Sequence, residues 1–272
     1  MSRPLFLVSL LKLAFPRRFL AARATRLPVV GRLLDRWLFA GDDIIYLPRD
    51  RLVAVQKSVD LPSQTVLPSR VVEHFVEQAG FHWIMNFCIC RSAEGCQDYP
   101  IELGCLFLGE AARGINPKLG RPVTKEEALA HVRRCSDAGL VHLIGRNKLD
   151  TVWLGIGPGR QLMTVCHCCP CCCLWRILPA VSPEIAAKVA RMPGVMVQVN
   201  RDACTGCGAC VRSICFVNAI SMVEEHAHIS EACRGCGRCV DVCPQGAIEI
   251  TIADDQSVEK SVERLSTRVD VS

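Results

Sequence analysis

The chain has 272 residues, of which 50% are hydrophobic and 22% are charged, a composition that excludes a disordered or fibrous protein. Its 19 cysteines are an odd number, and their short spacings argue against a disulfide framework and indicate metal or redox chemistry in a reducing compartment. The net charge of +5 is uneven, because residues 1–40 hold eight basic residues against Asp35 alone.

Residues 1–40 are predicted to form a basic helical arm. Leucine-rich stretches at 4–15 and 29–40, bounded by Pro16 and Pro28, predict two short amphipathic helices. Charges near the first stretch argue against an export signal, and no stretch approaches the ~20 apolar residues of a spanning helix. Two interpretations stay open: peripheral attachment to a membrane, or docking on the protein's own core or on a partner subunit. We expect a cytoplasmic protein, on the inner face of the membrane under the first interpretation.

Residues 41–193 predict a cysteine-rich domain of mixed α+β structure. Capping residues and breakers predict three helices, over 70–79, from Thr124 with Glu127 to Gly139, and from Ser182 to Pro193. Apolar stretches predict three strands between the last two helices, at 140–144, 151–156 and 161–166.

The stretch from Phe81 to Cys90 predicts a further strand, because its large apolar residues alternate with a period of two. The opposite face of this strand would present Cys88 and Cys90. We therefore expect the two thiols to point the same way, toward a shared ligand site.

Residues 194–252 contain an internal repeat of cysteines. The first copy has cysteines at 204, 207, 210 and 215, and the second at 233, 236, 239 and 243. The first three are offset by 29 residues and the fourth by 28. Cysteines at i, i+3 and i+6 suit a glycine-bearing loop around one face of an iron-sulfur cube, with a fourth thiolate from a distant part of the chain.

These motifs resemble the C-x2-C-x2-C-x3-C-P run of bacterial dicluster ferredoxins. The resemblance implies a pseudo-twofold βαββαβ fold, with strands near 195–199, 221–223, 227–229 and 247–251. It also implies two [4Fe-4S] clusters, one held by Cys204, Cys207, Cys210 and Cys243 and the other by Cys233, Cys236, Cys239 and Cys215.

The first copy departs from the family pattern at one place. Four residues rather than three separate Cys210 from Cys215, and Phe216 stands where the family has proline. We expect the loop to bulge there and the fourth ligand to survive. Zinc is the competing interpretation of the module, but overlapping triplets fit paired C-x2-C zinc knuckles badly.

The central domain has ten further candidate ligands: Cys88, Cys90, Cys96, Cys105, Cys166, Cys168, Cys169, Cys171, Cys172 and Cys173. Bare thiols packed this densely oxidise readily, so we expect some to be ligated. Our hypothesis is that a subset holds one or more additional iron-sulfur clusters. A structural zinc site, a dithiol redox site and cysteines packed as small hydrophobes are alternatives. Cys135 is expected to be core filler, and His167 is the one histidine among the cysteines.

The leading functional hypothesis is an iron-sulfur electron-transfer protein or redox-complex subunit. It would pass single electrons through two [4Fe-4S] clusters to or from the central thiols, with redox proteins as donor and acceptor. The alternatives are a ferredoxin-fed reductase with a catalytic site near Cys166–Cys173, and a cluster assembly or scaffold factor. No nucleic-acid partner is expected, because the arm lacks an aromatic stacking platform. Residues 253–272 are expected to form a polar tail.

Overall fold

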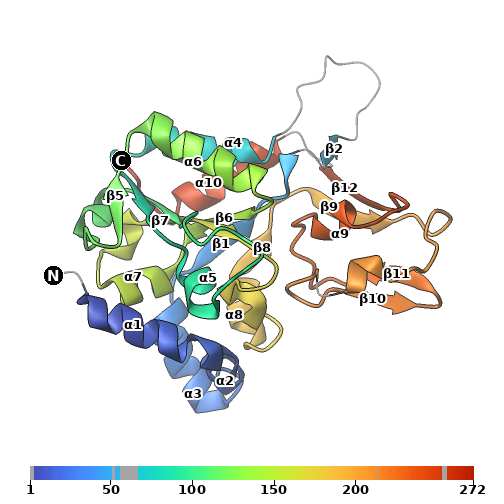
Figure 1. Cartoon of the computed structure of the whole chain (residues 1–272), viewed down its shortest axis with the longest axis horizontal. Coiled ribbons are helices and arrows are strands. Elements are labelled where there is room, and N and C mark those ends of the chain that lie inside the picture. Colours follow the sequence, from blue (N-terminus) through green and yellow to red (C-terminus); the bar gives the residue numbers. More distant parts are fainter. Residues whose placement is uncertain (1–2, 51–52, 56–66, 213, 253–255) are drawn as a thin grey trace.

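The computed structural model describes residues 3–50, 53–55, 67–212, 214–252 and 256–272. It has α+β architecture, as predicted, with a large body built on one sheet and a smaller C-terminal module beside it (Figure 1). Among the described residues, no helix has the length and apolar character needed to cross a membrane.

The sheet of the large body has seven strands. Their spatial order is β5 (Gly120–Pro122), β3 (His82–Met85), β4 (Leu106–Leu108), β7 (Met163–Cys168), β6 (Val141–Arg146), β1 (Asp43–Tyr46) and β8 (Val189–Arg191). All neighbours are antiparallel except β1 and β8. The strands β1, β3 and β4 are buried at every position, because elements cover both faces of the sheet.

Alternation along the strands divides the core in two. Ile45, Ile144 and Val165 face the cluster beneath α4 (Ser69–Gln78), α6 (Lys125–Asp137) and α10 (Ser257–Ser266). Tyr46 and Leu143 face the opposite cluster. The elements on that side of the body are the arm helices α1 (Leu5–Ala14), α2 (Arg18–Ala24) and α3 (Pro28–Leu34), with α5 (Ile89–Glu94), α7 (Lys148–Leu154) and α8 (Pro183–Ala187).

The C-terminal module contains a three-stranded sheet and a hairpin. The sheet order is β2 (Val53–Val55), β12 (Ile248–Ile252) and β9 (Val195–Val199), and the hairpin joins β10 (Ile220–Val223) to β11 (His226–Ile229). The short helix α9 (Arg238–Asp241) precedes β12. These strands begin and end within one residue of the four expected segments. The strand β2 belongs to residues 41–193, and its pairing with β12 therefore links that part of the chain to the C-terminal module.

Three local expectations differ from the structure. Residues 151–156 lie largely in α7, because Asp150 accepts hydrogen bonds from Asn147, Trp153 and Thr164 that fold the chain into a turn. The expected strand through Cys90 ends at Met85, and Cys88 and Cys90 lie at the start of α5. The helix after Ser182 ends at Ala187, because the following residues pair with β1 as β8.

The expected polar tail is also wrong as a description of residues 257–266. They form α10, which packs on α4. Leu265 of this helix is buried in the core, and so are Val269 and Val271 in the residues that follow it. Apolar residues at helical spacing carry this packing. Arg264 and Arg268 pair with Asp43 of β1, which fixes the helix on the large body.

Replacing Leu265 with alanine should test the role of α10. The side chain is fully buried, so the Leu265→Ala variant should lose about 2 to 5 kcal/mol of stability and its apparent Tm should fall by about 4 °C or more. Glu263→Ala on the exposed face of the same helix is the control, and its Tm should stay within about 2 °C. Equal midpoints for both variants would contradict the packing.

Candidate metal centre

Glycines shape both cysteine loops of the C-terminal module. Gly206 and Gly235 have φ values of +70° and +66° and lie against other backbone or side chains, so that a Cβ at Gly206 would stand 2.4 Å from the Glu225 carbonyl oxygen. Only glycine adopts this conformation with such a close approach at little cost. The two loops can therefore curl tightly, with their cysteines facing inward.

Each loop borders a cavity that the other loop completes. One cavity is lined by Cys204, Cys207, Cys210 and Cys243. A second cavity is lined by Cys215, Cys233, Cys236 and Cys239. The structure thus brings together the two sets that the ferredoxin resemblance assigns, including the exchange of the fourth cysteine.

The cavity walls suit an iron-sulfur cluster. They are apolar, and backbone amides point at the sulfurs: Ala219 donates to Cys215 at 3.2 Å, Ala247 to Cys243 at 3.3 Å and Ala227 to Cys204 at 3.5 Å. Such donors stabilise negative charge on cluster thiolates. The residues present therefore fit two [4Fe-4S] clusters, and cluster binding by these residues stays a prediction.

The residue after the fourth cysteine of the first motif packs against the large body, whereas the bulge expected between Cys210 and Cys215 includes Ser213, which lies outside the described residues. Phe216 is buried, with its ring centroid 4.6 Å from that of Tyr46. The hydroxyl of Tyr46 lies 3.9 Å from Cys173 Sγ. The second cavity, which Phe216 lines, therefore adjoins the cysteines of the central domain through two aromatic rings.

The strand β7 sorts the central cysteines by alternation. Cys166 and Cys168 point to the face that carries Tyr46, whereas His167 points to the face covered by α6. The turn that follows β7 then supplies the remaining four cysteines of the crowded segment. The ten candidates fall into two groups.

The inner thiol group is the one nearer the C-terminal module. Its members are Cys88, Cys90, Cys105, Cys166, Cys168 and Cys173. Cys105 and Cys166 have sulfurs 3.7 Å apart, and Cys168 and Cys173 have sulfurs 3.1 Å apart. Cys88 and Cys90 hydrogen bond to each other across the first turn of α5. The expected pairing of these two thiols therefore arises on a helix end and not on a strand.

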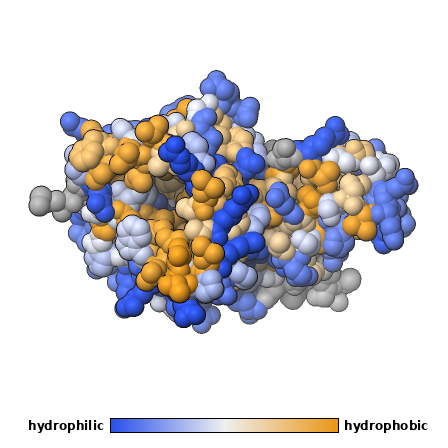
Figure 2. Space-filling view, turned by 90° about the horizontal axis from the view of Figure 1, so that it is seen from below, coloured by the Kyte–Doolittle hydropathy of each residue, from blue (hydrophilic) through white to orange (hydrophobic). Residues whose placement is uncertain are grey.

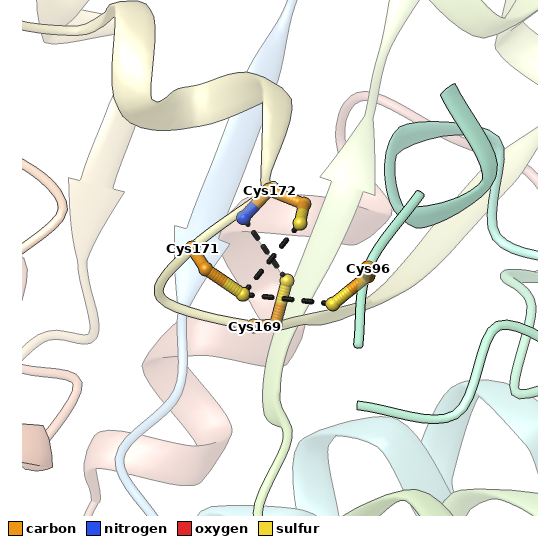
Figure 3. A group of neighbouring side chains, drawn as sticks. All are labelled: Cys96, Cys169, Cys171 and Cys172. Atoms are coloured by element: carbon orange, nitrogen blue, oxygen red, sulfur yellow. Dashed lines mark hydrogen bonds between the residues drawn. The ribbon is translucent and has the colours of Figure 1, made fainter. Parts of the chain in front are cut away.

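The four-thiol group comprises Cys96, Cys169, Cys171 and Cys172 (Figure 3). Their sulfurs all lie within 4.8 Å of one another. Cys96 follows the left-handed Gly95 that ends α5, and the other three come from the turn after β7. The sulfurs are not bonded to one another, since all 19 cysteines are free.

Two buried arginines supply positive charge to these thiols. Arg91 is fully buried and donates to the carbonyl oxygens of Pro100 and His167, each at 2.8 Å, and of Leu103. Arg238 is 7% exposed and donates to the carbonyl oxygen of Cys168. Among the described residues, neither has an ion pair with a carboxylate. A buried cation needs a nearby anion, and thiolates are the anions at hand.

Charge within the inner thiol group is concentrated on Cys168. Hydrogen bonds from the Cys166 and Cys173 thiols hold the pKa of Cys168 well below its ordinary value, and Arg238 and Arg91 act in the same direction. The hydrogen bond from Cys90 lowers the pKa of Cys88 to about 7. Cys88 and Cys168 are therefore favoured as thiolates near neutral pH, as metal binding requires. Hydrogen bonds to neighbouring cysteines raise the pKa of Cys90 and Cys166, and burial raises the pKa of Cys173.

A buried row of histidines, not found from the sequence, lies behind β7. His142 Nδ1 and His167 Nδ1 are 2.8 Å apart, and Ser136 Oγ is 2.7 Å from His142 Nε2. His131, Cys135 and His167 have ligand atoms within 4.8 Å of one another. Burial lowers the pKa of His142 to about 4, so the row is neutral. The contact between α6 and β7 is what unites these residues, and no spacing in the sequence signals it.

Removing the buried charge of Arg91 should release the central thiols. Arg91→Met leaves three carbonyl oxygens and neighbouring thiolates without their cation, so about 3 to 5 kcal/mol should be lost, and the apparent Tm should fall by roughly 6 to 20 °C. The number of thiols that react with a thiol reagent should also rise. Arg113→Met is the control, because Arg113 is 53% exposed in its pair with Glu110 and such pairs contribute under about 1 kcal/mol. Equal behaviour of the two variants would contradict the charge argument.

Comparison with known proteins addresses the C-terminal module. No curated protein and no solved structure matches the chain. Residues 203–247 match the family model of the 4Fe-4S dicluster domain, and the match includes all eight cysteines of the two cavities. The resemblance of the C-terminal region to dicluster ferredoxins is thereby confirmed, and the chain carries an iron-sulfur domain at residues 203–247.

Proposed function

We propose that the protein is an iron-sulfur electron-transfer protein or redox-complex subunit. It passes single electrons between two [4Fe-4S] clusters in the C-terminal module and an iron-sulfur centre held by the inner thiol group. The observation that carries the proposal is the contact between the second cavity and the inner thiol group, through Phe216, Tyr46 and Cys173.

The two cavities have different surroundings. Cys207, at the first cavity, is exposed, whereas Cys236 and Cys239 at the second are half-buried and packed among apolar side chains. When bound, each cluster supplies a centre that accepts or releases one electron. The exposed rim at Cys207 therefore suits contact with a redox protein, and the sheltered second cavity suits exchange within the molecule.

The inner thiol group has the ligands that a further cluster needs. Six thiols converge there from α5, β7 and the turns that follow β7 and precede β4. Thiolates are soft ligands and favour iron-sulfur clusters. Arg91 and Arg238 balance the negative charge that a thiolate-bound cluster brings, and the apolar cluster around Tyr46 limits access of water.

One packing unit spans the two sites. Tyr46, Phe216 and Cys173 are all buried in a single apolar cluster, against which Cys215, Cys233 and Cys236 also pack. The guanidinium of Arg238, which lines the second cavity, donates to the carbonyl oxygen of Cys168. The ligands of the second cavity and those of the inner group therefore pack against the same apolar cluster, which supports electron exchange between the two sites.

The count of iron and acid-labile sulfide should test this proposal in the full chain, purified without oxygen. Two [4Fe-4S] clusters account for about eight irons and about eight acid-labile sulfides, so the wild type should contain clearly more than eight sulfides. The Cys105→Ala/Cys166→Ala variant should return to about eight sulfides, with the iron that accompanies them, and should take up fewer electrons than the wild type in a reductive titration.

Cys135→Ala is the matched control, because Cys135 is fully buried yet lies outside both thiol groups. It should keep the iron, sulfide and electron counts of the wild type. About eight sulfides in the wild type, together with inner thiols that react freely, would refute the central cluster and leave an ordinary pair of ferredoxin clusters.

A further inference from the structure

The four-thiol group differs in geometry from the cluster sites of the same molecule. Cys96 and Cys171 have sulfurs 3.7 Å apart, and Cys171 and Cys172 have sulfurs 3.6 Å apart. In Figure 3 the four sulfurs converge on a common point from two segments of the chain. Among the described residues of the C-terminal module, by contrast, no three cysteine sulfurs lie within 4.8 Å of one another.

These separations match a single ion. Four thiolates around a tetrahedral ion with metal–sulfur bonds of about 2.3 Å stand about 3.8 Å apart at the edges of the tetrahedron. A [4Fe-4S] cube instead attaches each thiolate to a different iron atom, which places the sulfurs farther apart around a cavity, as the eight ferredoxin cysteines are placed. The four-thiol group is too compact for the cube.

Backbone amides stabilise negative charge on two of these sulfurs. The amides of Asp98 and Tyr99 donate to Cys96, and the amide of Cys172 donates to Cys169 at 3.3 Å. Arg176 donates to the carbonyl oxygen of Cys171 and holds the turn closed. Donors to metal-bound thiolates are the usual second layer of such sites.

The site is also closed on its inner side. Cys96, Cys169 and Cys172 are buried against an apolar cluster that contains Cys135 and Leu140. Four protein ligands without an open position are typical of a structural ion, whereas catalytic ions keep a position for water or substrate.

We propose that Cys96, Cys169, Cys171 and Cys172 bind one four-coordinate thiophilic divalent ion, zinc or iron, which carries no sulfide. This inference does not depend on the proposed electron transfer. The ion ties the turn after β7 to the end of α5.

Metal and sulfide analysis of the full chain tests the proposal. The Cys96→Ala/Cys171→Ala variant should lose about one zinc or one iron per chain and no sulfide, whereas Cys135→Ala in the same apolar cluster should lose neither. Loss of several irons together with sulfide, or an unchanged metal content, would overturn the proposal. Failure of the proposed central cluster would give a different result, namely a wild type with no sulfide beyond the roughly eight of the two ferredoxin clusters.

X-ray absorption spectroscopy of the wild type tests the same proposal without a variant, so the result does not depend on whether a variant folds. If zinc is bound, the zinc edge should show four sulfur neighbours at about 2.3 Å. If iron is bound, the wild type should contain about one iron per chain beyond the iron that accompanies sulfide. Nitrogen or oxygen neighbours on zinc, or equal iron and sulfide without zinc, would overturn the assignment.

A second and independent observation concerns the arm. Of the twelve large hydrophobic side chains that are exposed among the described residues, eleven lie between Leu5 and Trp37. They are Leu5, Phe6, Leu10, Leu11, Leu13, Leu20, Leu27, Val29, Val30, Leu33 and Trp37. Figure 2 views the molecule from the side of the arm and shows apolar side chains gathered there with hydrophilic ones among them. Exposed apolar surface of this extent marks an interaction site.

The arm is anchored, so this exposure belongs to the folded protein. Val8, Ala22 and Phe39 are buried against the body, Arg18 pairs with Glu94 of α5, and Arg26 donates to the carbonyl oxygen of Val181 at 3.2 Å. One side of the arm therefore docks on the body, and the opposite side presents apolar residues to solvent.

The charge of the exposed side indicates what covers it. Arg17, Arg23, Arg32 and Arg36 are exposed between the apolar residues, and Asp35 is the one acidic residue in residues 1–40. Helices of ten, seven and seven residues are too short to span a bilayer. Basic residues interleaved with leucine and tryptophan suit the interface of a bilayer with anionic lipids. We infer that the arm binds an anionic membrane surface.

Vesicle flotation tests this inference. The wild type should float with vesicles of equal parts phosphatidylcholine and phosphatidylglycerol, and bind phosphatidylcholine vesicles more weakly. Leu13→Glu/Leu33→Glu should lower the partition coefficient about tenfold or more. Val223→Glu is the control, because Val223 is the one exposed large hydrophobic residue outside the arm in the described chain. Absence of flotation, with self-association that the double variant abolishes, would show a protein-binding face instead and overturn the inference.

Discussion

Balance of charge in a water-poor interior is the constraint on which the central domain depends. Ten cysteines gather there without a disulfide, and Arg91 lies fully buried against both thiol groups. A buried guanidinium costs several kcal/mol unless anions compensate it, and a set of buried neutral thiols would not. The arrangement is therefore self-consistent when some of these thiols are ionised, Cys88 and Cys168 among them, and metal binding is the ordinary way to keep buried thiols ionised.

The position of Arg91 also explains why two different sites can share one segment of chain. Its three hydrogen bonds hold the carbonyl oxygens of Pro100, Leu103 and His167, and these residues belong to the segment before β4 and to β7. Alternation along β7 sends Cys166 and Cys168 to the inner thiol group, and the turn after β7 returns three further thiols toward Cys96. A buried cation thus fixes the two segments from which both groups are built.

The sequence allowed prediction of what is encoded locally. The capping box of Thr124 and Glu127 forms as expected, and the four strands of the C-terminal module lie where the resemblance placed them, because short-range patterns determine both. Cys96 and Cys171 are in contact although they lie 75 positions apart in the sequence. The contact between His131 and His167 depends on how α6 packs on β7. The spacing of residues in the sequence does not predict such long-range contacts. The segment 151–156 was misjudged because Asp150 draws Thr164 and Trp153 into a polar network that overrides strand propensity.

The departure of the first cysteine motif from the ferredoxin pattern gains a physical reason in this fold. A proline at position 216 would lack the aromatic ring that contacts Tyr46. On the opposite side of the central thiols, α5 carries Cys90 and receives the arm through Glu94. Figure 1 shows the C-terminal module and α1 at opposite sides of the large body. The arm therefore docks on the large body through α5, and the C-terminal module docks through Phe216 and Arg238, so both ends of the chain hold segments that carry inner thiols.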